Sequence, residues 1–182
     1  SGNNIRYRYQ DRNLVDVNFD QKNDILIWDE TELKAYLQTE EGGFTSEQQA
    51  IPLGIELEGA EEVEDRLERE DQSDIQARTF HKIFDINADQ QPDLVTISIT
   101  SKGVLNKNTT YDFFMGSQSP TQTLNFPEQP NTQIRSNGIQ FDAQEKDFNN
   151  DGMTDFVISS VELGFWKIVN ALVRGSMSIN LD

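Results

Sequence analysis

The chain contains no cysteine among its 182 residues, and His81 is its single histidine. Without thiols it has no disulfides, no thiol nucleophile and no zinc–thiolate site. A Ser-His-Asp or histidine–metal site would rest on His81 alone, whose alternating strand position is typical of an ordinary strand histidine. No H-E-x-x-H, P-loop or nucleophile-elbow motif is present. These absences argue against most hydrolytic and metal-hydrolase chemistries.

Positive charge is also scarce. Lys and Arg number 15 against 32 Asp and Glu, which gives a net charge of -17. Because phosphate binding requires clustered cations, this charge argues strongly against a nucleic-acid partner. No apolar run approaches the roughly 20 residues of a membrane span, so we expect no membrane-spanning segment.

Aspartate, in contrast, is arranged in a nine-residue pattern that occurs three times, D-x-N-x-D-x-x-x-D. Each copy is followed at once by an apolar, mostly branched run that is typical of a strand. Carboxylate and amide oxygens at this spacing are the ligands that a hard divalent cation needs, and we infer up to three calcium ions. The side chains concerned are Asp16, Asn18, Asp20 and Asp24; Asp85, Asn87, Asp89 and Asp93; and Asp147, Asn149, Asp151 and Asp155.

The three copies begin at similar intervals along the chain, which is the signature of a repeat architecture. The sequence predicts an all-β fold in which each repeat forms about four short antiparallel strands. We expect a single domain over 1–182, with units at about 1–60, 75–126 and 134–182. In the second unit, the segment 123–126 is predicted to be a strand.

Two segments depart from this all-strand pattern. Residues 56–74 are rich in Glu, Asp and Arg, and their spacing favours a short exposed helix in an acidic excursion between units. Residues 163–174 place Lys167, Asn170 and Arg174 on one stripe of an otherwise apolar helix. Such a helix is most often buried against sheets, and the alternative is a docking surface for a partner or a membrane interface.

The nine-residue pattern differs from other calcium loops. An EF-hand requires a bidentate Glu at position twelve and a following helix, whereas position twelve here is Ile27, Thr96 or Ile158. A dockerin-like loop also requires an acidic twelfth position. The tandem Gly-rich nonapeptides of toxin-type repeats are absent.

The pattern and the strands that follow it instead resemble the FG-GAP or VCBS repeat, the calcium-loop blade of integrin-type β-propellers. The resemblance covers essentially the whole chain as three copies, and Gly43-Phe44 is similar to the Gly-Phe ending of that family's blade hairpin. It implies propeller-like blades, calcium held by the side chains listed above, and a backbone carbonyl ligand at position seven. Those carbonyls would belong to Lys22, Gln91 and Met153.

Position six distinguishes the three copies. The family prefers Gly there because the loop turns sharply, and only Gly152 matches this preference. Gln21 and Gln90 would have to adopt a conformation that costs roughly 1 kcal/mol or more for a residue with a Cβ. We therefore expect the third site to bind calcium most tightly and the second to be the weakest or the least regular.

Two functions remain open from the sequence. The favoured one is a noncatalytic calcium-binding scaffold or adhesion module of a secreted, cell-surface or periplasmic protein, with a protein or glycan ligand. The alternative is part of a secreted propeller enzyme, a polysaccharide hydrolase or lyase, in which a pair of carboxylates does the chemistry. Propellers usually close with four to eight blades, so three repeats imply an open arc that belongs to a longer propeller or self-associates through exposed edges or the 163–174 helix.

Overall fold

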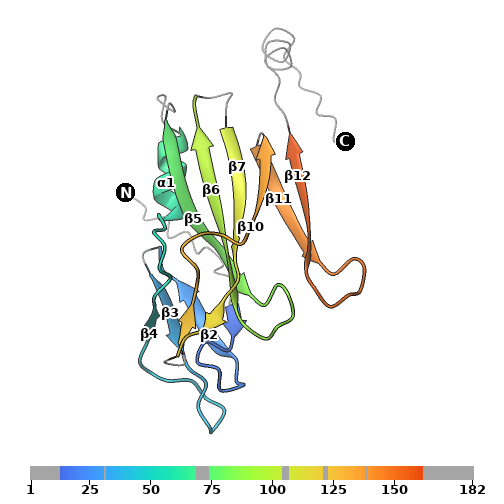
Figure 1. The fold of residues 1–182 in the computed structure, drawn as a ribbon. Helices are drawn as coiled ribbons and strands as arrows, with labels where there is room; N and C mark the ends of the chain where they lie inside the picture. Colours follow the sequence, from blue (N-terminus) through green and yellow to red (C-terminus); the bar gives the residue numbers. More distant parts are fainter. Residues whose placement is uncertain are drawn as a thin grey trace, which may run out of the picture.

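The computed structural model describes residues 13–30, 32–68, 74–103, 107–120, 123–137 and 139–161. Within these ranges the chain is mostly β, and its principal sheets are open and antiparallel (Figure 1). The first sheet contains β1 (Asn13–Val15), β2 (Asp24–Trp28), β3 (Leu33–Tyr36) and β4 (Gln49–Ile51), paired in chain order. Alternating buried and partly exposed residues in β2 and β3 explain this pairing, because period-two burial is what a sheet with one core-facing side requires.

The second sheet is built from longer strands. It contains β5 (Ile75–Phe84), β6 (Asp93–Ser101), β7 (Lys107–Phe114) and β10 (Thr132–Asn137), in the spatial order β10-β7-β6-β5. The third sheet is a hairpin of β11 (Ile139–Lys146) and β12 (Asp155–Val161). The prediction of antiparallel four-stranded sheets is thus confirmed for two sheets, although β10, the fourth strand of the second sheet, lies outside the predicted unit 75–126.

The strand predicted at 123–126 is present, but its pairing differs from that of the other strands of the second unit. The segment 123–126 does not join the second sheet: β9 (Leu124–Asn125) forms a two-stranded ribbon with β8 (Ser117–Gln118). Pro127 follows this segment directly and Pro130 comes three residues later, and neither has the N–H that a longer ladder needs. The six-residue β10 pairs along its whole length with β7 and is the fourth strand.

The acidic excursion contains a helix, α1 (Ala60–Glu68), as expected. Figure 1 shows α1 alongside β5, and Val63 is 2% exposed, so the helix packs on the sheet rather than being fully solvated. Glu30 Oε2 accepts the first helical N–H, from Ala60, at 2.5 Å and thereby satisfies one of the free donors of the helix N-terminus. The predicted helix at 163–174 lies outside the described residues.

Two apolar clusters hold the sheets together. The first lies between the first two sheets and combines Val15, Leu26 and Leu33 with Leu94 and Phe114. The second lies on the opposite face of the second sheet and includes Val95, Tyr111 and Phe113, on the side where β11 and β12 approach β7 and β10. The first sheet's strands are shorter than those of the second, so they cover only part of its face. No helix among the described residues has the length and apolar character needed to cross a membrane.

Candidate functional site: three equivalent aspartate loops

The three aspartate motifs occupy the same place in three hairpins. Residues 16–23 (loop 1) join β1 to β2, residues 85–92 (loop 2) join β5 to β6, and residues 147–154 (loop 3) join β11 to β12. In Figure 1 each loop lies at the lower end of its own hairpin. A cleft of about 400 Å³ is lined by both loop 1 and loop 2, and Thr154 N donates to Ile86 O at 3.0 Å between loops 3 and 2. The loops therefore form a row along one end of the sheets.

The aspartate at position one organises each turn through both carboxylate oxygens. Its Oδ1 accepts the backbone N–H of position five, at 3.0 Å in loop 1 and 3.2 Å in loops 2 and 3. Its Oδ2 accepts the N–H of position six, at 2.7, 2.8 and 2.9 Å respectively. The residues that accept these bonds are Asp16, Asp85 and Asp147. The same two bonds in three separate hairpins show that the motif specifies one loop conformation.

Positions three and five continue the pattern. The Asn Oδ1 accepts the N–H of the position-five Asp at 3.1, 3.0 and 2.9 Å in loops 1, 2 and 3. That Asp in turn accepts the N–H of position seven at 2.9, 2.8 and 2.8 Å. The residues at positions three and five are Asn18 and Asp20, Asn87 and Asp89, and Asn149 and Asp151. Because a carboxylate oxygen that accepts one hydrogen bond keeps a second lone pair, these bonds leave capacity for a cation.

Loop 1 differs from the others at position seven. Lys22 Nζ lies 3.2 Å from Asp20 Oδ2 and 2.8 Å from Glu40 Oε1, so an ammonium group already sits against one proposed ligand. Burial alone would raise the pKa of Asp20, but its hydrogen bonds from Lys22 and Asn18 hold that pKa below the usual value. In loops 2 and 3, which have no lysine at position seven, the same Asp oxygen accepts the Asn side-chain amide at 3.0 and 2.9 Å. The Lys22 ion pair was not anticipated from the sequence.

The aspartate at position nine links the loop to the sheet. In loops 1 and 2 this residue, Asp24 or Asp93, is fully buried, and its Oδ2 accepts the N–H of position two at 3.0 and 2.9 Å. Its Oδ1 accepts a backbone N–H from the end of the third strand, at 2.8 Å from Gln38 or Gly116. Desolvation is the main reason that the pKa of both carboxyls is raised, with the nearby loop aspartates adding to the effect. In loop 3, Asp155 accepts the N–H of Phe148 at 2.9 Å.

Positions four and six carry the backbone strain of the loops. At position six, Gln21 and Gln90 have the expected left-handed backbone, with φ of 70° and 67°. Gly152, at the same position of loop 3, has φ of 88°. Position four is also left-handed, with φ of 61°, 61° and 59° at Phe19, Ala88 and Asn150. The sequence analysis missed this second strained position, because positive φ is uncommon for residues such as Phe19 and Ala88 and only Asn150 is of a type that favours it.

The donor set fits a hard cation in chemical type, since every side chain at positions one, three, five and nine offers oxygen. In the part of the chain that the structure describes, no three or more His, Cys, Asp or Glu side chains converge in the way that defines a metal centre. The carboxylates instead turn towards the backbone N–H groups of their own loops. Calcium binding by these residues, including the backbone carbonyls of Lys22, Gln91 and Met153, stays a prediction.

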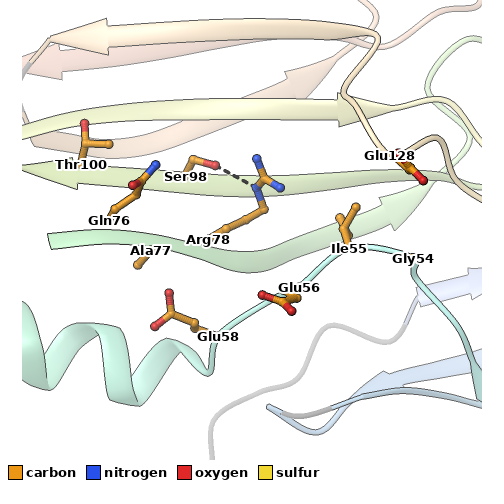
Figure 2. A pocket seen from close by; sticks show the side chains of 10 residues that line it. All are labelled: Gly54, Ile55, Glu56, Glu58, Gln76, Ala77, Arg78, Ser98, Thr100 and Glu128. Carbon is orange, nitrogen blue, oxygen red and sulfur yellow. Dashed lines mark hydrogen bonds between the residues drawn. The ribbon is translucent and has the colours of Figure 1, made fainter.

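A second candidate site lies on the face of the second sheet that the short first sheet leaves uncovered. Figure 2 shows a groove of about 630 Å³ whose floor carries Gln76, Arg78, Ser98 and Thr100 from β5 and β6. Its walls are the segment Gly54–Glu58 and the loop that carries Glu128. The lining is polar, and the sequence analysis did not detect it.

A buried carboxylate organises the floor of this groove. Asp112 on β7 is fully buried and accepts hydrogen bonds from Ser98 Oγ and, at 2.6 Å, from Gln133 Nε2. Arg78 Nε lies 3.1 Å from Ser98 Oγ and 3.4 Å from Asp112 Oδ2, and its guanidinium stands over the Phe114 ring. The signal that would have revealed this network is a polar residue on each of four neighbouring strands, in the register pairs Arg78–Ser98 and Asp112–Gln133.

His81 lies on β5 and packs edge-on against Tyr111, with ring centroids 5.4 Å apart. No protein-family model matches the chain, and comparisons with curated proteins and with solved structures found no significant similarity.

Proposed function

We propose that this chain is a noncatalytic calcium-binding repeat module in which each aspartate loop fastens one hairpin of a propeller-like blade. The observation that supports this most is the recurrence of the same hydrogen bonds in three separate loops, each at the turn between the first two strands of its sheet. A turn that gathers several carboxylates is repulsive on its own. A divalent cation would relieve that repulsion and stabilise the hairpin.

The proposed module works outside the cytosol, on a secreted, cell-surface or periplasmic protein. Extracellular calcium modules bind with dissociation constants of about 10⁻⁴–10⁻³ M, which suits loops that rely on carboxylates and strained turns. The scaffold presents a surface to a protein or glycan ligand. The polar groove around Arg78 supports this role. It combines the guanidinium of Arg78, which Ser98 holds in place, with several other side chains that can form hydrogen bonds.

Thermal unfolding in calcium and in chelator tests the proposal. At 5 mM calcium and a dissociation constant of about 10⁻⁴ M, each occupied site adds about 2 kcal/mol to the free energy of unfolding. We expect the melting temperature to rise with calcium and to rise much less with magnesium at equal ionic strength. An unchanged melting temperature would remove calcium from the proposal.

Single-loop variants identify which loops bind. Asp16→Ala, Asp85→Ala and Asp147→Ala should each lower the calcium stoichiometry measured by calorimetry by one. The loss of calcium-binding affinity should be largest for Asp147→Ala, because its loop has Gly152 at position six. Asp65→Ala, on the exposed side of α1, is the matched control and should leave the stoichiometry unchanged. Equal losses for the three loop variants would contradict the ranking.

A further inference from the structure

Loops 2 and 3 are joined by a backbone hydrogen bond, from Thr154 N to Ile86 O at 3.0 Å. Thr154 stands at position eight of loop 3, and Ile86 stands at position two of loop 2. Ile86 is itself well anchored: its N–H donates to the buried Asp93 at 2.9 Å, and its side chain, 8% exposed, packs in the second apolar cluster. The bond therefore ties loop 3 to a residue of loop 2 that the sheet already holds in place.

The peptide group that donates this bond also carries an expected calcium ligand of loop 3. Thr154 N–H and Met153 C=O belong to the same peptide group, which is trans, so its N–H points towards loop 2 and its carbonyl oxygen points the opposite way. A cation on that oxygen would polarise the peptide group and make the N–H a stronger donor, because linked polar interactions reinforce one another. Order in loop 3 and the bond to loop 2 should therefore strengthen each other.

Loop 2 cannot make the equivalent bond to loop 1. Its position eight is Pro92, which has no N–H to donate to the carbonyl of Val17 at position two of loop 1. Pro92 instead lines the cleft of about 400 Å³ between these two loops, together with Gln21 and Asn23 of loop 1. The proline thus divides the row into a bonded pair of loops and a separate loop.

We propose that loops 2 and 3 form a coupled pair, in which ordering of either loop strengthens the other, and that loop 1 is independent of both. The choice of calcium as the ordering ligand rests on the proposed function. In those terms, calcium at loop 3 raises the calcium affinity of loop 2, and the reverse effect is equal in size. One hydrogen bond of typical net strength gives a factor of about five in each affinity.

Amide hydrogen exchange of the full chain in chelator tests the coupling without any metal. The reporters are the position-six amides of Gln21, Gln90 and Gly152, each of which donates to the first aspartate of its own loop. Thr154→Pro removes the donor, and the loop conformation accommodates proline at position eight, because Pro92 stands there in loop 2. We expect exchange at the amides of loops 2 and 3 to become about fivefold faster and exchange at the amide of loop 1 to stay unchanged.

Two further variants complete this test. Asn23→Pro, at position eight of loop 1, is the matched control and should leave exchange in loops 2 and 3 unchanged. Asp147→Ala disrupts loop 3 from within and should also accelerate exchange at Gln90 about fivefold. In the Thr154→Pro background it should have no additional effect on Gln90, and if Thr154→Pro unfolds loop 3 outright, Asp147→Ala alone decides. An unchanged Gln90 amide in either variant, or an equal acceleration at Gln21, would overturn the coupling.

A calcium titration followed at the same amides separates the coupling from the proposed function. Asp147→Ala should lower the affinity reported by Gln90 about fivefold, and Asp85→Ala should lower that reported by Gly152 by the same factor. Gln21 should report the same affinity in both variants. If no loop bound calcium, the proposed function would fail and the exchange experiment would still decide the coupling. If the loops bound calcium with affinities that these variants left unchanged, the coupling would be overturned and the proposed function would stand.

Discussion

The carboxylate of Asp93 accepts the backbone N–H of Gly116 at 2.8 Å, although 23 residues separate them in the chain. Asp24 makes the equivalent bond to Gln38, also at 2.8 Å. In both cases the last aspartate of the loop joins the first hairpin to the end of the third strand. A buried carboxylate whose oxygens both accept backbone N–H groups is costly to remove, because those donors are then left unsatisfied.

Gly116→Ala tests how closely the backbone at Gly116 approaches Pro92, the last residue of loop 2. A Cβ at this position would lie 1.9 Å from the carbonyl oxygen of Pro92, which is backbone and moves only with the loop. We expect a loss of about 3 kcal/mol in the free energy of unfolding, measured in urea. The control is Gly43→Ala, whose Cβ would meet Thr39 Oγ1 at 3.7 Å and should change stability by less than about 0.5 kcal/mol. Similar values for both variants would contradict the close approach.

Gln21→Gly tests the strained position six. Gln21 has φ of 70°, where glycine has no steric penalty, so the substitution should stabilise the chain by about 0.5–1 kcal/mol despite the greater freedom of the unfolded glycine. Asn23→Gly is the matched control in the same loop, since Asn23 is exposed and is not left-handed. It should destabilise by a similar amount. Urea unfolding in chelator separates this effect from metal binding, and a destabilising Gln21→Gly would refute the strain.

Lys22→Met tests whether the ammonium group competes with a cation in loop 1. Lys22 Nζ contacts Asp20, so its removal should raise the calcium affinity of loop 1 on the order of tenfold. An NMR titration that follows the Gln21 amide measures this loop alone. Lys34→Met removes a lysine paired with Asp29 and Glu32 and should leave the affinity unchanged. Equal affinities with and without Lys22 would show that the ion pair does not compete.

The Arg78–Asp112 pair is tested by a double-mutant cycle. Arg78→Met leaves the fully buried Asp112 without its cation and should cost about 2 kcal/mol, less than for a fully buried pair because the Arg78 side chain is 34% exposed. Arg78→Met combined with Asp112→Leu should cost less than the sum, with a coupling energy of about 1–2 kcal/mol in urea unfolding.

The surface pair Lys34–Glu32 is the control for that cycle, and its coupling should stay below about 0.5 kcal/mol. If the two coupling energies were equal, the Asp112 network would be an ordinary surface ion pair. In that case Asp112 would hold the side chains of the groove floor no more firmly than a surface ion pair does.

Much of the local structure was predictable because it depends on residues close in the chain. The aspartate spacing specifies the loop, since positions one, three and five bond to backbone N–H groups at most five residues away. The apolar, mostly branched run after each ninth aspartate specifies strands such as Asp24–Trp28. The acidic segment specified a helix by its Glu and Arg spacing, although not the burial of Val63 against β5.

The errors and omissions concern pairings between distant segments. The fourth strand of the second sheet is Thr132–Asn137 and not Leu124–Asn125, because only the former can pair along most of β7. Local propensity contains no information about that match. The ion pair of Lys22 with Glu40 likewise joins residues 18 positions apart.

The sequence by itself determined the three loops, their strained sixth positions and the strands they connect, because hydrogen bonds and side-chain alternation within a few residues decide these features. Only the tertiary structure decided that the loops form one row, that Asp112 holds Arg78 over Phe114, and that the first sheet leaves a polar groove uncovered. The groove follows from the unequal strand lengths of two packed sheets, and the loop row and the Asp112 contacts follow from the pairing and packing of strands that are distant in the chain.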